Sequence, residues 1–240
     1  MKENVEKRVN WIKNILTSAN AKGIVIGMSG GKDCALVGIL SKMATENVVG
    51  IIMPCESSSN YGADREDALE LNEKFGIKTI EVDLTNIKKE FRKVLKPISE
   101  SQYEMAYANI NPRLRMITLY NYAQREGYLV AGTGNRSERT MGYFTKWGDG
   151  AYDFNPIGDM TATEIFEMLR YLGVPENILK KAPSAGLIEG QTDEKDFGIT
   201  YEELDTYILH NKATPEVKKI VDKAYNSTKH KRENPRIYPN

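Results

Sequence analysis

The chain has 240 residues, with 33 basic and 33 acidic side chains. This length suffices for one α/β domain with a full hydrophobic core, and the balanced charge argues against a general nucleic-acid-binding protein. No apolar run approaches the length that spans a bilayer, and the polar N-terminus has no signal-peptide core, so we expect a cytoplasmic protein that binds neither nucleic acid nor membrane.

Cysteines and histidines are scarce, with two of each: Cys34, Cys55, His210 and His230. They are too few for a disulfide scaffold or a structural zinc site. Any metal is therefore expected to be a hard cation held by carboxylates and phosphates.

The chain opens with apolar residues at helical spacing, from Val5 to Leu16, which predict an amphipathic helix. Short apolar runs typical of buried strands then alternate with helical patterns. The expected strands are Gly23–Met28, Val48–Met53, Lys78–Leu84 and Tyr128–Ala131. The expected helices are about Asp33–Met43, Tyr61–Phe75, Arg113–Gln124 with Pro112 in its first turn, and Thr161–Leu172 with Thr161 and Glu164 as a capping box.

This alternation is typical of an α/β protein with a doubly wound, mostly parallel sheet and helices on both faces. We find no repeat and no domain boundary, so residues 1–240 are expected to form a single domain. Two stretches, Lys96–Asn111 and Lys181–Gly198, resist assignment. Long irregular segments inside a compact domain are often lids or binding loops.

A glycine-rich turn, Ser29-Gly30-Gly31-Lys32-Asp33-Cys34, lies between the first expected strand and the next helix. Glycines let backbone N–H groups approach an anion, and the helix start adds further donors and partial positive charge. The spacing matches neither the usual P-loop nor the dinucleotide fingerprint. We interpret the turn as a phosphate-binding loop; the alternative is an ordinary strand-to-helix turn.

The Ser-Gly-Gly-x-Asp form resembles the pyrophosphate loop of the N-type ATP pyrophosphatases, which cleave ATP between its α- and β-phosphates and adenylate an acyl or carbonyl oxygen. Further strings follow in order: Gly132–Glu138, Gly142–Gly150 with Asp153, Pro183–Leu187 and Glu189–Glu194. Together these strings resemble the ammonia-dependent NAD synthetases from about residue 5 to the C-terminus.

The resemblance implies an adenine nucleotide alpha-hydrolase-like fold and an ATP-dependent ligase. Such an enzyme amidates deamido-NAD (nicotinic acid adenine dinucleotide) with ammonia through an acyl-adenylate, giving NAD, AMP and pyrophosphate. It also implies Mg²⁺ as cofactor and a homodimer, in which the segment around His230 can serve the site of the other subunit. Glutamine-using relatives carry an extra amidase domain with its own catalytic cysteine; nothing of that size is present, so we expect free ammonia or ammonia from a separate partner.

Each matched residue receives a role from the resemblance. The residues assigned to ATP are Gly27, Met28, Ser29, Gly30, Gly31, Lys32, Asp33, Cys34, Thr133 and Ser184. Those assigned to deamido-NAD are Arg113, Lys146, Asp153, His230 and Lys231, and those assigned to Mg²⁺ are Asp33 and Glu138. The catalytic set is Asp33, Lys146, Asp149 and Asp153, in which either Asp149 or Asp153 discharges the ammonium proton.

Two positions depart from the family pattern: Cys34 stands where a Ser or Thr is usual, and Ala162 stands where a Lys is usual. A thiol is a weaker hydrogen-bond donor than a hydroxyl. These departures keep two alternatives open: another adenylating enzyme of the same loop class, such as a tRNA-modifying one, and a non-catalytic adenine-nucleotide-binding paralogue. On composition alone, Asp33 and Glu138 are also readable as helix-start carboxylates, and residues 229–232 as a basic tail.

Overall fold

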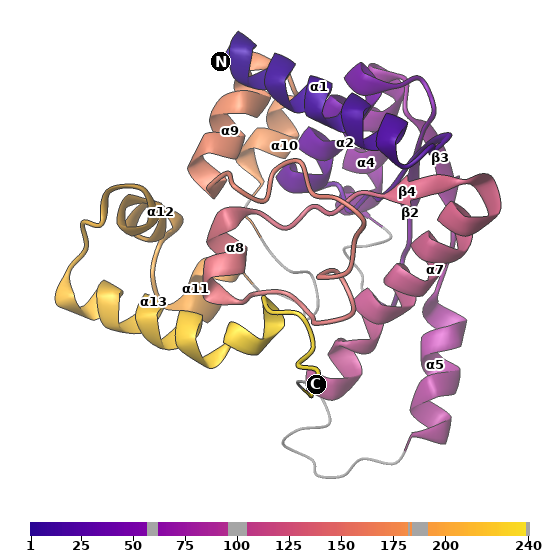
Figure 1. Cartoon of the computed structure of the whole chain (residues 1–240). Helices are drawn as coiled ribbons and strands as arrows, with labels where there is room; N and C mark the ends of the chain where they lie inside the picture. The colour runs from indigo at the N-terminus through magenta and orange to yellow at the C-terminus, as the bar shows by residue number, and fades with distance from the viewer. Residues whose placement is uncertain (57–61, 96–104, 182, 184–191, 239–240) are drawn as a thin grey trace.

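The computed structural model describes residues 1–56, 62–95, 105–181, 183 and 192–238. Four strands form one sheet in the order β3-β2-β1-β4, and every neighbouring pair is parallel (Figure 1). The strands are β1 (Gly23–Gly27), β2 (Val48–Ile52), β3 (Lys78–Glu81) and β4 (Tyr128–Val130). β1 and β2 are buried almost throughout, as apolar runs without alternation predict.

The order of the strands places a topological switch point between β1 and β4. From β1 the chain winds outward to β2 and β3, and then returns to the other side of β1 with β4. Ligands of open α/β sheets bind outside the carboxyl ends of the strands at such a point. The turn after β1 and the loop after β4 therefore meet where a binding site is expected.

Helices cover both faces of the sheet (Figure 1). One buried cluster joins the sheet to α1 (Lys2–Ser18), α2 (Lys32–Ala44), α4 (Ala63–Phe75), α9 (Ala162–Tyr171) and α10 (Glu176–Lys180). A second cluster packs α7 (Ile110–Glu126) on the other face. The doubly wound parallel sheet predicted from the sequence is thus confirmed.

The C-terminal helices form a separate layer beside α8 (Arg136–Met141). They are α11 (Asp193–Phe197), α12 (Tyr201–His210) and α13 (Pro215–Ser227), followed by the short 3₁₀ helix η1 (Lys229–Lys231). A third apolar cluster holds them to α8 through residues such as Met141, Leu204 and Val221. This layer carries the C-terminal residues towards the loop that follows α8 (Figure 1).

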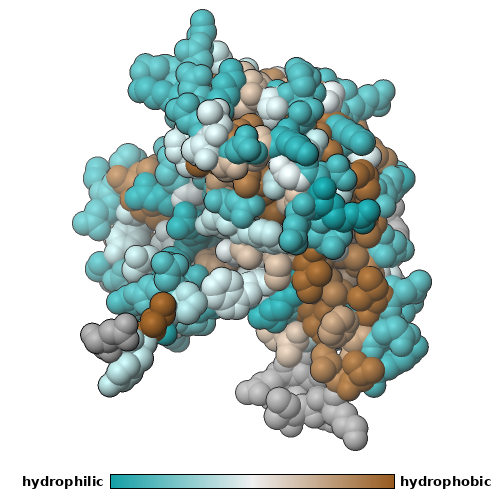
Figure 2. All heavy atoms as spheres, turned by 45° about the vertical axis from the view of Figure 1, so that its right-hand side comes forward, coloured by the Kyte–Doolittle hydropathy of each residue, from teal (hydrophilic) through white to brown (hydrophobic). Residues whose placement is uncertain are grey.

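One helix, α5 (Thr85–Val94), packs along α7 and leaves apolar side chains outside. Ile87, Phe91 and Val94 share one face of α5 and are exposed, as are Leu95 at its C-cap and Ile117 on the neighbouring α7. Figure 2 shows an apolar surface over this part of the molecule. We refer to these five residues as the α5 patch.

Sequence and structure differ at several element ends. β3 ends at Glu81, three residues before the expected Leu84, because Leu84 already serves as the N-cap of α5. The stretch Lys96–Asn111 is helical in part, since residues 105–108 are helical and α7 begins at Ile110. α11 lies in the second unassigned stretch, and Thr161 and Glu164 do form the expected capping box of α9. None of the described helices combines the length and apolar character needed to cross a membrane.

Candidate active site

The turn between β1 and α2 is shaped by a glycine that no other residue can replace without strain. Gly30 has a φ of +72°, and a Cβ at this position would lie 2.2 Å from the carbonyl oxygen of Asp64. Gly31 then forms the N-cap of α2 without a side-chain cap, so the first N–H groups of this helix have no capping side chain. A helix start of this kind suits a phosphate group.

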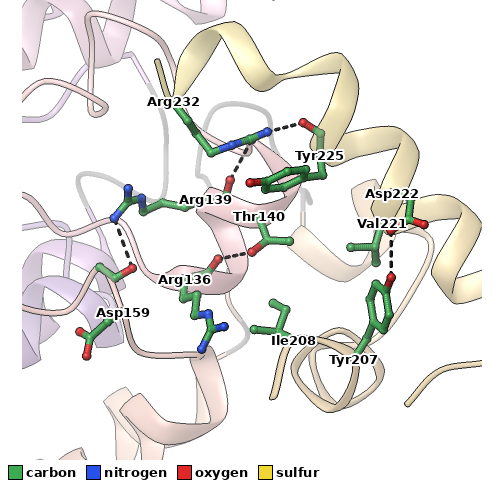
Figure 3. A pocket seen from close by; sticks show the side chains of 11 residues that line it. Arg136, Arg139, Thr140, Asp159, Tyr207, Ile208, Val221, Asp222, Tyr225 and Arg232 are labelled. Carbon is green, nitrogen blue, oxygen red and sulfur yellow. Dashed lines mark hydrogen bonds between the residues drawn. The ribbon is translucent and has the colours of Figure 1, made fainter. Parts of the chain in front are cut away.

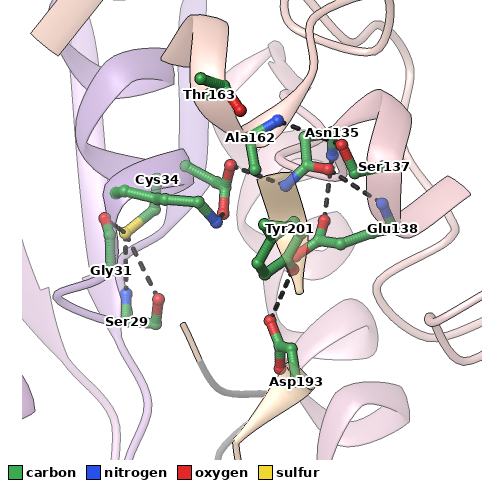
Figure 4. A network of polar contacts seen from close by, with 12 residues as sticks. Ser29, Gly31, Cys34, Asn135, Ser137, Glu138, Ala162, Thr163, Asp193 and Tyr201 are labelled. Carbon is green, nitrogen blue, oxygen red and sulfur yellow. Dashed lines mark hydrogen bonds and ion pairs between the residues drawn. The ribbon is translucent and has the colours of Figure 1, made fainter. Parts of the chain in front are cut away.

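Cys34 supports the turn from the inside (Figure 4). Its thiol donates to the carbonyl oxygen of Gly31 at 3.1 Å and accepts from the N–H of Ser29 at 3.3 Å. The side chain of Met28 also points inward, where it packs against Gly38 and Gly50. The side chains of these two residues therefore hold the loop in shape and do not face solvent.

Two carboxylates from distant parts of the chain are joined by one amide. Asp33 lies in the first turn of α2, and its Oδ1 accepts a hydrogen bond from Nδ2 of Asn135 at 3.1 Å. Asn135 is also the N-cap of α8, where its Oδ1 accepts from the N–H of Glu138 at 2.9 Å. The Oε2 of Glu138 accepts in turn from the N–H of Asn135 at 3.0 Å, as Figure 4 shows. The switch point thus brings Asp33 and Glu138 together.

The charges around this pair favour a cation. Burial, and next the charge of Asp33, raise the pKa of Glu138 well above its ordinary value, although Lys32 and the Asn135 N–H oppose this shift. Asp193 is also buried nearby and accepts a hydrogen bond from the hydroxyl of Tyr201 at 2.7 Å. A pair of carboxylates that repel one another in a partly buried space is relieved by positive charge.

Asp33 and Glu138 are the two carboxylates that the resemblance assigns to Mg²⁺, and their chemistry suits this ion. Within the described residues no group of three or more His, Cys, Asp or Glu side chains is arranged to hold a metal. Two carboxylates are nevertheless what Mg²⁺ takes when phosphates and water complete its shell. Asp33 and Glu138 would hold it next to the helix start that suits phosphate.

Lys32 is buried beside the same pair. Its Nζ lies 2.7 Å from Oδ2 of Asp33, and only 5% of its side chain is exposed. The aromatic rings of Tyr201 and Phe166 lie 5.4 and 5.9 Å from Nζ. Burial lowers the pKa of the Lys32 ammonium, but the nearby carboxylates, led by Asp33, raise it above its ordinary value.

Four residues assigned to deamido-NAD converge on the loop after α8. Nζ of Lys146 donates to the carbonyl oxygen of His230 at 2.7 Å, and Arg113 of α7 donates to the carbonyl oxygen of Lys146 at 3.3 Å. Lys231 donates to the carbonyl oxygens of Gly142 and Phe144 at 2.9 and 2.8 Å. Three segments separated in sequence therefore build one basic corner.

The two candidate acceptors of the ammonium proton lie in different surroundings. Oδ1 of Asp149 accepts from the N–H of Thr145 at 2.9 Å, and desolvation raises the pKa of this carboxyl group. Oδ2 of Asp153 accepts from the N–H of Val130 at 2.7 Å, at the end of β4. Its Oδ1 accepts a hydrogen bond from the hydroxyl of Tyr120. Burial, and next the charge of Asp153, raise the pKa of Tyr120 to about 12. Neither aspartate bonds to the Asp33–Asn135–Glu138 network in the part of the chain that the structure describes.

The remaining predicted ATP residues are Thr133 and Ser184. Thr133 lies, half-buried, in the loop after β4 that leads to Asn135. Ser184 lies outside the described residues, as does half of the stretch from Lys181 to Gly198. Lys181 itself forms ion pairs of 2.6 Å with Asp64 and Asp67 and lies 3.5 Å from the carbonyl oxygen of Gly30.

Sequence reasoning gave no individual role to four residues that organise the site: Asn135, Asp193, Tyr201 and Asp205. Asp205 accepts from Ser137 at the start of α8 and from the N–H of Thr163 at the start of α9. The N–H of Ala162 donates to the same Ser137 hydroxyl at 3.1 Å, so the family's Lys position lies at the junction of these two helices. For Asn135 a signal was present, because Asn followed three residues later by Glu is an N-cap pattern.

Beside α8 lies a pocket of about 480 Å³ (Figure 3). Three arginines line it, and two of them donate hydrogen bonds to backbone carbonyl oxygens of the protein. Arg139 donates to the carbonyl oxygen of Gly158 at 3.3 Å, while Arg232 donates to the carbonyl oxygen of Arg139 at 3.1 Å. These contacts fasten α8 to the loop before α9 and to the C-terminal segment, and so fix the helix that carries Glu138.

Comparison with known proteins agrees with this geometry. The family model described as NAD synthase matches residues 4–235. The NH(3)-dependent NAD(+) synthetases of Carboxydothermus hydrogenoformans and Finegoldia magna are each 46% identical to the chain; they align with 98% and 95% of it and with 96% and 92% of their own lengths. Among solved structures, an NMN synthetase from Francisella tularensis has a TM-score of 0.91 and 36% identity, covering 100% of this chain and 98% of that one. An NH3-dependent NAD synthetase from Campylobacter jejuni has a TM-score of 0.81 and 30% identity, covering 99% and 98%. The chain therefore belongs to the NAD synthase family.

Proposed function

We propose that the protein joins ammonia to the nicotinate carboxyl group of deamido-NAD at the expense of ATP, giving NAD, AMP and pyrophosphate. The observation that carries this proposal is the junction of Asp33 and Glu138 through Asn135, beside the glycine turn and the start of α2. Family membership supports it over a tRNA-modifying activity.

In the first step a carboxylate oxygen of the substrate attacks the α-phosphorus of ATP. The bond from the α-phosphorus to the oxygen that bridges to the β-phosphate breaks, and pyrophosphate leaves. Backbone N–H groups of Gly31 and of the first turn of α2 would receive the phosphate charge. Mg²⁺ held by Asp33 and Glu138 would supply further neutralisation of the triphosphate when bound. Lys146, with Arg113 and Lys231, would orient the dinucleotide from the loop after α8.

In the second step ammonia attacks the adenylated carbonyl carbon, and the bond to AMP breaks. The extra proton passes to a carboxylate or to water. Both carboxylate oxygens of Asp153 already accept hydrogen bonds, from the Tyr120 hydroxyl and the Val130 N–H, whereas Asp149 has a raised pKa, which suits a proton acceptor better. We therefore favour Asp149 for this role.

The test is a coupled measurement of NAD and AMP with purified protein, deamido-NAD, ATP, Mg²⁺ and ammonium. Equal amounts of NAD and AMP are expected, and Asp33→Asn is expected to reduce both at least about 100-fold. ATP binding without AMP release would favour the non-catalytic paralogue instead. Near-normal turnover of Asp33→Asn would remove the central assignment.

A second acceptor is favoured by one comparison. A solved relative with a TM-score of 0.91 is named an NMN synthetase, so nicotinate mononucleotide is a candidate in place of the dinucleotide. The same carboxyl group reacts in both cases. Comparing kcat/KM for the two acceptors in one assay decides between them, since only the dinucleotide presents an adenosine half to bind.

We also propose that the protein is a cytoplasmic homodimer with one domain per chain. The α5 patch supports the dimer, because a contiguous exposed apolar stripe of this kind is typical of an interface. The first buried cluster joins the sheet to α1, α2, α4, α9 and α10, which supports one cooperative unit. The role of the η1 segment in the partner's site remains part of this proposal.

A further inference from the structure

Lys32 is the one residue of the glycine turn whose side chain carries positive charge into the carboxylate site. Its ammonium lies 2.7 Å from Oδ2 of Asp33 and is held between that carboxylate and the rings of Tyr201 and Phe166. A lysine with 5% of its side chain exposed is not a solvated surface charge. Its position requires a reason beyond solubility.

The Lys32 ammonium is bound to a carboxylate that a metal ion would also need. Both oxygens of Asp33 are engaged, Oδ2 by Lys32 and Oδ1 by Asn135. Mg²⁺ approaches carboxylate oxygens to about 2.1 Å, so an ammonium on the same group would face it at close range. Two like charges so close repel strongly in a partly buried site. Metal and ammonium therefore compete for Asp33.

Without a metal, the Lys32 ammonium is the positive charge that acts on the nearby carboxylates. Asp33, Glu138 and Asp193 act together on Lys32, and Lys32 in turn opposes the rise in the pKa of Glu138. A buried carboxylate pair without a counter-charge would be costly to fold. Lys32 supplies that counter-charge from within the chain.

We propose that Lys32 is a built-in counter-ion of the Asp33–Glu138 pair, which keeps the affinity of the nucleotide-free protein for divalent cations low. This inference rests on the proposed function for the identity of the nucleotide. When ATP is bound, its phosphates offer the ammonium a second partner near the start of α2, and Asp33 becomes free to take the metal. Lys32 is thus a positioning residue that couples metal entry to nucleotide.

The test measures Mn²⁺ binding to nucleotide-free protein from the electron paramagnetic resonance signal of the free ion. Wild-type protein is expected to bind weakly, while Lys32→Met and Lys32→Gln bind at least about tenfold more tightly. Lys88→Met is the matched control: Lys88 is also buried and paired, with Glu56 at 3.3 Å, but lies outside this site. It should leave Mn²⁺ binding unchanged. With a non-hydrolysable ATP analogue present, the difference between wild type and Lys32→Met should shrink.

Thermal unfolding gives a second readout. In EDTA, Lys32→Met is expected to unfold at a lower temperature than wild type and to recover when Mn²⁺ is added, whereas wild type shifts little. Lys32→Met that binds Mn²⁺ no more tightly than wild type overturns the inference. If neither variant folds, the wild-type titration still decides: tight Mn²⁺ binding without nucleotide also overturns it. Because these titrations need no turnover, a failure of NAD formation would count against the proposed function alone.

Discussion

The oxygen and the nitrogen of the Asn135 side-chain amide hydrogen-bond to different parts of the molecule. The amide oxygen caps α8, and the amide nitrogen donates to Asp33 on the other side of the switch point. The side chain is fully buried, so its orientation is fixed by these partners. The distance between Asp33 and Glu138 therefore depends on one amide group.

Substitution separates the two tasks of Asn135. Asn135→Ser keeps an N-cap oxygen but lacks the amide NH₂ that reaches Asp33, so we expect near-normal stability with kcat/KM reduced about 10–100-fold, as for other residues that orient metal ligands. Asn135→Ala should lose the same activity and also about 1 kcal/mol of stability. Equal activity of the Ser variant and wild type would show that the bond to Asp33 does not matter for turnover. Denaturant unfolding supplies the stability comparison.

The raised pKa of Glu138 has a consequence for stability. A carboxyl group whose pKa is higher in the folded protein than in the unfolded chain favours folding while it is protonated, and this contribution is lost as the pH rises through the folded pKa. Glu138→Gln retains an acceptor for the Asn135 N–H, so without metal it should unfold at a higher temperature than wild type at neutral pH. The advantage should vanish as the pH falls towards 4.5, the ordinary value. An advantage that does not change with pH would contradict this account.

At the scale of elements, α8 and α9 begin at one shared point. Ser137 and Asp205 tie the first turn of each helix together, and each helix has its own capping box. Asp205 comes from within α12 and is buried at these helix starts, where both of its carboxylate oxygens accept hydrogen bonds. The site therefore rests on the ends of helices, which are held more firmly than free loops.

The cap of α9 can be tested directly. Thr161 accepts from the N–H of Glu164 and is fully buried, so Thr161→Ala should lower the free energy of unfolding by about 1–2 kcal/mol. Thr161→Ser keeps the hydroxyl and should lose less than half of that amount. Urea unfolding of both variants checks the ranking. A Ser variant as unstable as the Ala variant would assign the effect to lost packing.

Strands and long helices followed from the sequence because their patterns are local. Apolar runs gave all four strands of the described sheet, and the Thr-x-x-Glu pattern gave the start of α9. Helices of five or six residues, such as α8 and α11, are too short for a period to show. The pairing of Asp33 with Glu138 was available from the resemblance, but the bridge through Asn135 and the inward turn of Lys32 depend on contacts 102 residues apart and on side-chain orientation, which no local pattern encodes.

At the scale of the whole molecule, the α5 patch stays exposed among the residues that the structure describes. Val94 is 73% exposed, so Val94→Glu adds a charge without disturbing the monomer's core. If two copies meet through this patch, the variant should shift the mass measured by light scattering from a dimer towards the 27.1 kDa of one chain. Met43→Glu, an exposed apolar position on α2, is the control and should remain dimeric. A Val94→Glu protein with unchanged mass would exclude this surface.

The reactivity of the Cys34 thiol, which lies beneath the glycine turn, would report how often that turn opens. Both cysteines are buried, and burial raises the pKa of Cys55, which keeps its thiolate fraction small. Cys34 hydrogen-bonds to Ser29 and Gly31, so a reagent such as a maleimide reaches it only after these bonds open. In a Cys55→Ser background, the labelling rate would then report the free energy of local opening at the catalytic turn. Cys34, which departs from the family pattern, thus makes the local opening of this turn measurable without introducing another cysteine.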